Sequence, residues 1–151
     1  MGKKSKNHGP SLSPQINAGV RERPSTVNIS ANALEKYLDN EHVSINLRFF
    51  QKSCECFSKW QSHELKKFSA AIEKIRGYNP DMLRSNASLC EIHKGAPASK
   101  RFSLPNDISP DQALHEIKVD PSNKLRIHGF FSGSVFFMIW LDREHACFPA
   151  K

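Results

Sequence analysis

The chain has 151 residues, enough for one domain with a modest hydrophobic core. Lysine and arginine outnumber aspartate and glutamate by 22 to 15, which gives a formal net charge of +7. A positive balance of this size favours nucleic acid, an acidic protein or anionic lipid as a partner. The apolar run between Gly133 and Asp142 is much shorter than the ~20 residues that span a bilayer, so we expect no membrane segment.

The first 28 residues are rich in Lys, Ser, Asn, Gly and Pro and contain almost no large apolar side chain. This composition predicts a disordered basic tail over 1–28, followed by a single domain over 29–151. The polar start lacks the apolar segment of a secretory signal, so we expect a cytoplasmic protein with reduced thiols. A possible capping residue, Ser30, and apolar residues on one helical face predict a short helix over 30–38.

Residues 42–50 alternate between polar and apolar side chains, which predicts a half-buried strand. The longest helix is expected from Ser62, which can act as its cap, to Gly77, which is a natural stop. Its apolar residues recur at helical spacing over 65–75. Residues 78–113 contain four prolines and predict loops, with one short helix near residues 81–83.

The C-terminal part predicts three consecutive antiparallel strands. Residues 113–120 alternate as a short strand and are closed by a turn over 121–123. Two apolar runs, 125–131 and 135–141, flank Ser-Gly-Ser and predict a β-hairpin. The second run has no polar residue, so we expect it in the middle of the sheet. The fold class predicted is therefore α+β: a small, twisted, mainly antiparallel sheet with helices packed on one face.

A set of basic and imidazole side chains follows from the strand pleat. Lys124, Arg126 and His128 alternate with Leu125 and Ile127, so they share one face of their strand. Metal-independent RNA cleavage needs proton transfer, which suits histidine, and cations around the phosphate, which suit arginine. If this face is solvated, we expect it to be joined by further candidates from the neighbouring strand and the C-terminal tail, namely His115, Arg143 and His145. The alternative is that these side chains are only the solvated face of a strand.

Two other patterns suggest different sites. Three thiols and an imidazole, Cys54, Cys56, Cys90 and His93, are a tetrahedral zinc set by residue type, although one-residue spacing in the first pair is unusual. The alternative is ordinary buried or idle thiols. The aromatic side chains of 130–140 could stack on bases, but core packing explains most of them.

The element order and three C-terminal segments resemble the RelE/ParE-like toxin superfamily. The segments are 115–119 (HEIKV), 124–128 (KLRIH) and 135–148 (VFFMIWLDREHACF). The resemblance implies a RelE-like fold and cleavage of messenger RNA. It also implies that Arg126 stabilises charge at the scissile phosphate, that Lys118 is a basic residue of the preceding strand, and that Arg143 and His145 supply a cation or a general acid. The sequence departs from the family at Glu116, where a basic residue is expected, at Glu144, where the tail has a second basic position, and at Phe148, which replaces a tyrosine.

We therefore expect the toxin component of a toxin–antitoxin pair that cleaves or binds RNA without metal or cofactor. The expected catalytic residues are Arg126, His128, Arg143 and His145, and the expected RNA-binding residues are Lys118, Lys124 and His115. The expected partners are RNA and an antitoxin protein. The alternatives are a noncatalytic module of the same fold that binds nucleic acid or protein, and a small zinc-stabilised domain.

Overall fold

Two α-helices, a single 3₁₀ turn and five strands make up residues 41–149, the part of the chain that the computed structural model describes. The expected tail over 1–28 and helix over 30–38 lie outside the described residues. In chain order the elements are β1 (Ser44–Asn46), η1 (Phe57–Lys59), α2 (Ser62–Ile75), α3 (Pro80–Ser85), β2 (Cys90–His93), β3 (Leu114–Lys118), β4 (Arg126–Ser132) and β5 (Val135–Asp142).

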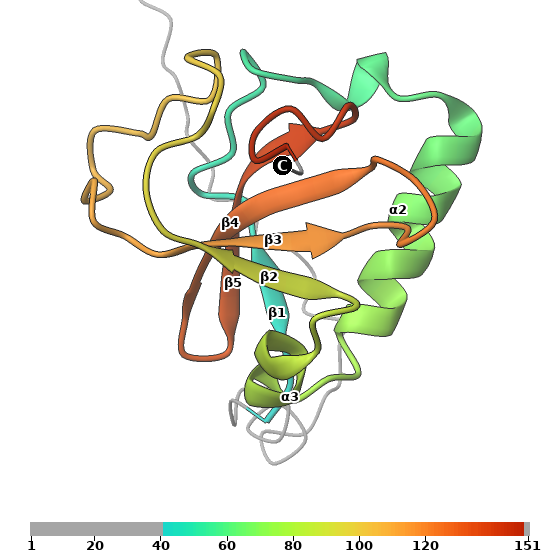
Figure 1. Ribbon diagram of the computed structural model, residues 1–151. Helices are drawn as coiled ribbons and strands as arrows, with labels where there is room; N and C mark the ends of the chain where they lie inside the picture. The colour runs from blue at the N-terminus through green and yellow to red at the C-terminus, as the bar shows by residue number, and fades with distance from the viewer. Residues whose placement is uncertain (1–40, 150–151) are drawn as a thin grey trace, which may run out of the picture. The chain divides into compact units, whose positions relative to one another are not determined.

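The strands form a single mixed sheet in the order β1-β5-β4-β3-β2 (Figure 1). The pairs β2–β3, β3–β4 and β4–β5 are antiparallel, whereas β1 runs parallel to β5. The α+β class, the three consecutive antiparallel strands and the interior position of the apolar strand β5 are thus confirmed. The order also leaves β1 and β2 as the two edges of the sheet.

The β4–β5 hairpin contains a tight turn and a bulge. Gly133 lies in the turn at φ 59°, a backbone conformation that favours glycine. Further along, His128 pairs with Trp140 and Gly129 with Met138, so that Ile139 is an extra residue on β5. The bulge brings the carbonyl of Phe137 so close to Gly129 that a Cβ there would lie 2.0 Å from its oxygen. Glycine is therefore required at this position.

Helix α2 begins and ends as its sequence predicts, with one difference at the cap. The N-cap is Gln61 rather than Ser62, and Glu64 closes a capping box with the Gln61 backbone. The apolar side of α2 faces the sheet, with Ala71 and Ile75 buried in the same core as Leu83 of α3. The predicted short helix at 81–83 is confirmed as α3, whose N-cap Asn79 accepts a hydrogen bond from the backbone N–H of Asp81.

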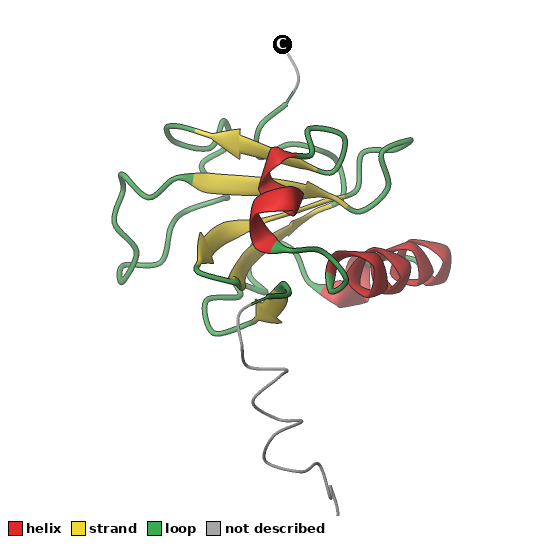
Figure 2. Cartoon of the chain, turned by 90° about the horizontal axis from the view of Figure 1, so that it is seen from below, coloured by secondary structure: helices red, strands yellow, loops and turns green. Residues whose placement is uncertain are grey.

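Both faces of the sheet are covered, and each has its own core. On one face, α2 and α3 pack on strand residues such as Ile117, Ile127 and Leu141 (Figure 2). On the other face there is no helix within 41–149. Trp140 is instead covered by Phe102 and Ile108 of the long 94–113 segment. It is also covered by Cys147 of the C-terminal tail, which is residues 143–149. The helices therefore lie on one face, as predicted, but irregular segments cover the face that was expected to be open.

Two strands differ from expectation. The strand expected over 42–50 is only Ser44–Asn46, because the Asn46 side chain accepts a hydrogen bond from the Arg48 backbone and the chain turns. The strand β2 falls in a region where loops were expected. No helix among residues 41–149 is long and apolar enough to cross a membrane.

Candidate functional site

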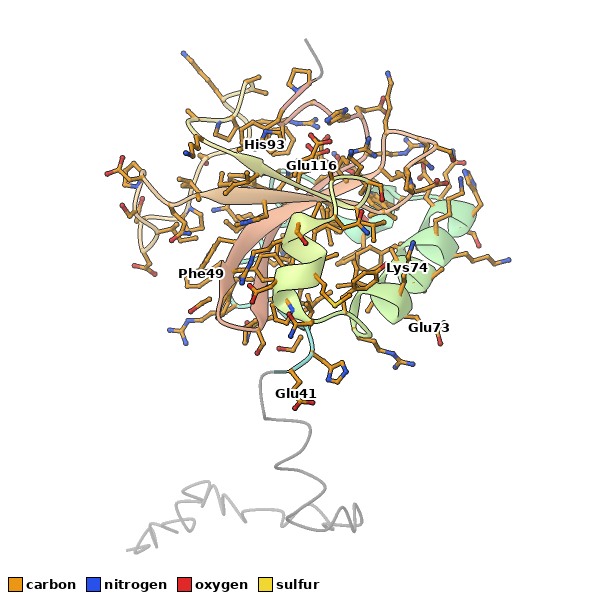
Figure 3. The ribbon with its side chains drawn as sticks, turned by 60° about the horizontal axis from the view of Figure 1, so that its bottom comes forward. Glu41, Phe49, Glu73, Lys74, His93 and Glu116 are labelled. Atoms are coloured by element: carbon orange, nitrogen blue, oxygen red, sulfur yellow. The ribbon has the colours of Figure 1, made fainter. Side chains whose placement is uncertain are left out.

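The centre of the candidate site is the carboxylate of Glu116, on the sheet face opposite the helices. Its Oε1 accepts a hydrogen bond from Arg126 Nε at 2.8 Å. Its Oε2 lies 3.2 Å from His93 Nε2 and, on the other side, 3.2 Å from His145 Nε2. One buried carboxylate thus holds an arginine and two imidazoles, and Figure 3 shows His93 next to Glu116.

Strand register explains how three of these side chains meet. Glu116 pairs with Glu91 on β2 and with His128 on β4, and cross-strand partners point to the same face. Alternation then places His93 and Arg126 on that face as well. The Arg126 guanidinium is further fixed by donation from Nη1 to the carbonyls of Asn123 at 2.7 Å and Leu125 at 3.0 Å.

His145 reaches the site from a strained turn after β5. Its backbone φ is 55°, the left-handed region that costs a non-glycine residue about 1 kcal/mol. The Asp142 carboxylate holds this turn, because it accepts hydrogen bonds from the backbone N–H groups of Ala146 at 2.9 Å and Cys147 at 2.8 Å. Backbone strain persists only where surrounding contacts fix it, and it is frequent at functional sites.

Phe148 covers the site from the C-terminal tail. Its ring stacks on His93 with centroids 4.1 Å apart and planes 2° from parallel, and it meets His128 edge-on. The Glu116 side chain is only 1 % exposed, whereas His93 and His145 are 21 % and 20 % exposed. The two imidazoles therefore form the solvent-facing side of the cluster. A molecule from solvent can contact Glu116 only if the tail moves.

A second buried pair, His128 and Asp142, lies next to the site, where His128 contacts Phe148. The His128 Nε2 lies 3.1 Å from Asp142 Oδ2, and both side chains are fully buried. Burial lowers the pKa of His128, although Asp142 acts in the opposite direction. Burial also acts to raise the pKa of Asp142, but hydrogen bonds from His128, Ala146 and Cys147 outweigh it and leave that pKa below its ordinary value. The pair is thus a neutral imidazole donating to a carboxylate, which agrees with the lack of a partner for His128 Nδ1.

Two of the three remaining basic candidates, Arg143 and Lys118, have structural partners. Arg143 Nε donates to Glu64 Oε1 at 2.7 Å, which ties the tail to the first turn of α2. Lys118 forms an ion pair with Glu91 and donates to the Ala87 carbonyl at 3.0 Å. Lys124 is exposed in the turn before β4. Of the expected set, only Arg126 and His145 contact Glu116 directly.

Two expectations about the site are wrong. Arg126 and His128 do share a face of β4, but that face is not solvated, since 94–113 and the tail cover it and leave them 7 % and 0 % exposed. His115 points to the helix face instead, where its ring meets Phe131 at 5.1 Å, because it pairs with Gly129 rather than His128.

The expected zinc set does not come together either. Cys90 is buried in the core under the helices, whereas His93, three residues on, lies on the other face of the sheet. Cys54 contacts the Arg101 carbonyl, and the four cysteines are all free thiols.

Sequence reasoning missed the two residues that matter most. Glu116 was read only as a departure from a basic family position, and His93 only as a zinc ligand. The signal available was the alternation His115-Glu116-Ile117-Lys118, which puts Glu116 on the same face as Lys118. His93 could not be found in this way, because β2 was not predicted.

The arrangement can transfer protons. A carboxylate fixed by an arginine and flanked by two imidazoles contains a potential base, two potential acids and positive charge within one cluster. Comparisons of the chain with protein-family models, with curated proteins and with solved structures found no match.

Proposed function

We propose that this protein is a metal-independent endoribonuclease whose active site is built around Glu116. The observation that carries the proposal is the approach of both His93 Nε2 and His145 Nε2 to within 3.2 Å of Glu116 Oε2, with Arg126 on the other oxygen. Cleavage of RNA by its own 2′-hydroxyl needs a base and an acid, and a cluster of this composition contains both.

The roles follow from the chemistry. Once Phe148 moves off the site, Glu116 accepts the proton of the 2′-hydroxyl, and the 2′-oxygen attacks phosphorus. His145, as an imidazolium, gives its proton to the departing 5′-oxygen, so the products carry a 2′,3′-cyclic phosphate and a 5′-hydroxyl. Arg126 orients Glu116 and contributes positive charge next to the developing phosphorane.

His145 is assigned as the acid and His93 as the second imidazole because their settings differ. His145 lies on a strained turn, a feature of functional positions, whereas His93 is held flat against Phe148. The proposed site keeps Arg126 and His145 of the expected set and adds Glu116 and His93. His128 has a supporting role as the buried partner of Asp142.

The element order supports a RelE-like toxin as the wider setting, with RNA as substrate and an antitoxin as partner. A strand, then helices, then three antiparallel C-terminal strands is the order on which that resemblance depends, and the chain has this order with β2 as an additional antiparallel strand. Growth arrest on induction, relieved by Glu116→Gln, is the expected behaviour of such a toxin.

A noncatalytic binding module is the second candidate, and the burial of Glu116 favours it. With 1 % of that side chain exposed, a structural ion cluster under the tail would need no access to RNA. The two candidates differ in what substitution of Glu116 does to RNA cleavage.

The test is cleavage of a labelled RNA oligonucleotide by the full chain in the presence of EDTA. Glu116→Gln preserves an acceptor for Arg126, and His145→Asn suits the turn because asparagine tolerates positive φ. Each is expected to lower the cleavage rate by about 10²–10⁴-fold, the usual contribution of a general base or acid. His93→Gln should have a smaller effect.

Matched controls are available on α2, where Glu73 and His63 are exposed. Glu73→Gln and His63→Asn are expected to cleave at the wild-type rate. No cleavage by the wild-type protein in EDTA, or equal rates for Glu116→Gln and Glu73→Gln, contradicts the proposal and favours the binding module.

A further inference from the structure

The ring of Phe148 occupies a position between two other aromatic side chains. It lies parallel to the His93 imidazole within 2°, with the ring centroids 4.1 Å apart, and it meets His128 edge-on with centroids 5.6 Å apart. One of these rings comes from β2 and the other from β4, and together they define what we call the stacking position. Nucleobases are planar rings that stack on His and Phe side chains in complexes with single-stranded RNA.

The His93 ring is a fixed platform next to the proposed catalytic carboxylate. Its Nε2 lies 3.2 Å from Glu116 Oε2, and Arg126 in turn holds Glu116 at 2.8 Å (Figure 3). Pairing of His93 with Leu114 of β3 fixes the backbone at the same point. A platform that is already oriented loses little entropy when a ligand stacks on it.

Phe148 can leave the stacking position while the rest of the tail stays in place. The tail is anchored as far as Cys147, whose N–H donates to Asp142 at 2.8 Å and whose carbonyl accepts from the Ala98 N–H at 2.8 Å. Phe148 is the next residue, is only partly buried and contacts His93 through its ring. Rotation of the chain after Cys147 would move this ring into solvent without breaking either anchor.

We propose that the stacking position is a subsite for a nucleobase of the RNA substrate, and that Phe148 inhibits the enzyme by occupying it. The base of the nucleotide that carries the attacking 2′-hydroxyl stacks on His93, which brings that hydroxyl toward Glu116. A pyrimidine suits the position, because its six-membered ring has the size of a phenyl ring. It also brings polar atoms next to His128, whose Nδ1 has no hydrogen-bond partner within 41–149. The inference rests on the proposed function, since it names the part of the RNA that the site holds.

Binding of cytidine 5′-monophosphate and of ribose 5-phosphate, which lacks the base, tests the subsite without any cleavage. The full chain is titrated with each compound, and the backbone amide signals of β2 are followed by NMR. Phe148→Ala should bind cytidine 5′-monophosphate about 2–12-fold more tightly than the wild type, because it no longer has to break an aromatic pair. The same variant should bind ribose 5-phosphate about 5–150-fold more weakly than the nucleotide, the usual contribution of base stacking. Equal affinities for the two compounds overturn the subsite.

Substitutions of His93 distinguish stacking from a general effect on the tail. In the Phe148→Ala background, His93→Ala should reduce the affinity for cytidine 5′-monophosphate to that for ribose 5-phosphate, whereas His93→Phe keeps an aromatic platform and should retain the preference for the nucleotide. The control Phe49→Ala removes another partly buried phenyl ring from the core on this face and should bind like the wild type. Circular dichroism checks that every variant folds. Loss of the preference in His93→Phe, or tighter binding by Phe49→Ala, overturns the subsite.

Cleavage in EDTA tests the same subsite during the reaction. Phe148→Ala should raise kcat/KM by about 2–12-fold, and Phe49→Ala should leave it unchanged. An abasic ribonucleotide on the 5′ side of the cut bond keeps the 2′-hydroxyl and should slow cleavage by about 5–150-fold. If RNA is cut but either change has no effect, the subsite is overturned and the nuclease is retained. Binding of cytidine 5′-monophosphate that depends on His93, in a protein that cuts no RNA, retains the subsite and overturns the nuclease.

Discussion

Replacing Glu116 tests whether a buried ion cluster forms the centre of this face. In Glu116→Ala, the Arg126 guanidinium stays buried, and its Nε loses the hydrogen bond of 2.8 Å to the Glu116 carboxylate. Breaking a buried ion pair from one side typically costs 3–5 kcal/mol. Arg126 Nη1 keeps two carbonyl acceptors, at 2.7 Å and 3.0 Å, so we expect the lower end, about 3 kcal/mol.

The partly exposed imidazoles add little to this cost, because water can replace the carboxylate at His93 and His145. Glu116→Gln keeps an oxygen for Arg126 Nε and loses only the charge, so it should cost about half as much, roughly 1.5 kcal/mol. The alanine and glutamine variants thus form a graded pair at one position.

The assay is urea unfolding followed by circular dichroism, with a double-mutant cycle between Glu116→Ala and Arg126→Met. If the two side chains form the buried pair, the double variant is less destabilised than the sum of the singles by about 2 kcal/mol. Additive effects, or a loss below 1 kcal/mol in Glu116→Ala, would refute the reasoning about the cluster.

The remaining predictions concern the supporting structure. Since burial lowers the pKa of His128, the folded protein keeps this imidazole neutral at a pH where the unfolded chain gains a proton. The free energy of unfolding should therefore decrease as the pH falls below about 6.5. The His128 ring signals in NMR should not titrate there. Retention of full stability at pH 5.5, or titration of His128 near pH 6.5, would contradict this. Gly129→Ala should destabilise the protein by about 3 kcal/mol or more in the same urea assay, because its Cβ would lie 2.0 Å from a carbonyl oxygen; a loss under 1 kcal/mol would rule out the bulge. Burial raises the pKa of Cys90 to about 11, whereas hydrogen bonds with Ser58 lower that of Cys56, so iodoacetamide at pH 8 should label Cys56 first and Cys90 only after unfolding, as mass spectrometry can show. Equal labelling rates for the two thiols would count against their assigned environments.

Most of the sheet follows from local patterns in the sequence. The hairpin is specified by apolar runs around Gly133, and α2 by its 3.6-residue periodicity and a stop at Gly77. Strand β2 was missed because Cys90–His93 is short and half of it is exposed at the sheet edge, so its burial pattern carries little alternation. Such a strand is determined by tertiary pairing with β3 rather than by its own composition.

The candidate site was only partly predictable, for a different reason. Alternation correctly placed Arg126 and His128 on one face, but no local pattern indicates whether that face is covered. The covering comes from 94–113 and the tail, where single anchors such as Phe102 and Phe148 dock on the strands. The role of Glu116 depends on partners 23 and 29 positions away, His93 and His145, which only the fold brings together.

The chemistry of the cleavage products tests the central claim most directly. The full chain is incubated in EDTA with an RNA oligonucleotide and with the same sequence carrying 2′-O-methyl groups, and the products are analysed by mass spectrometry. Glu116 acting on a 2′-hydroxyl predicts that the RNA alone is cut, leaving 2′,3′-cyclic phosphate and 5′-hydroxyl ends. Cleavage of the methylated strand, 5′-phosphate products, or an uncut RNA would contradict it.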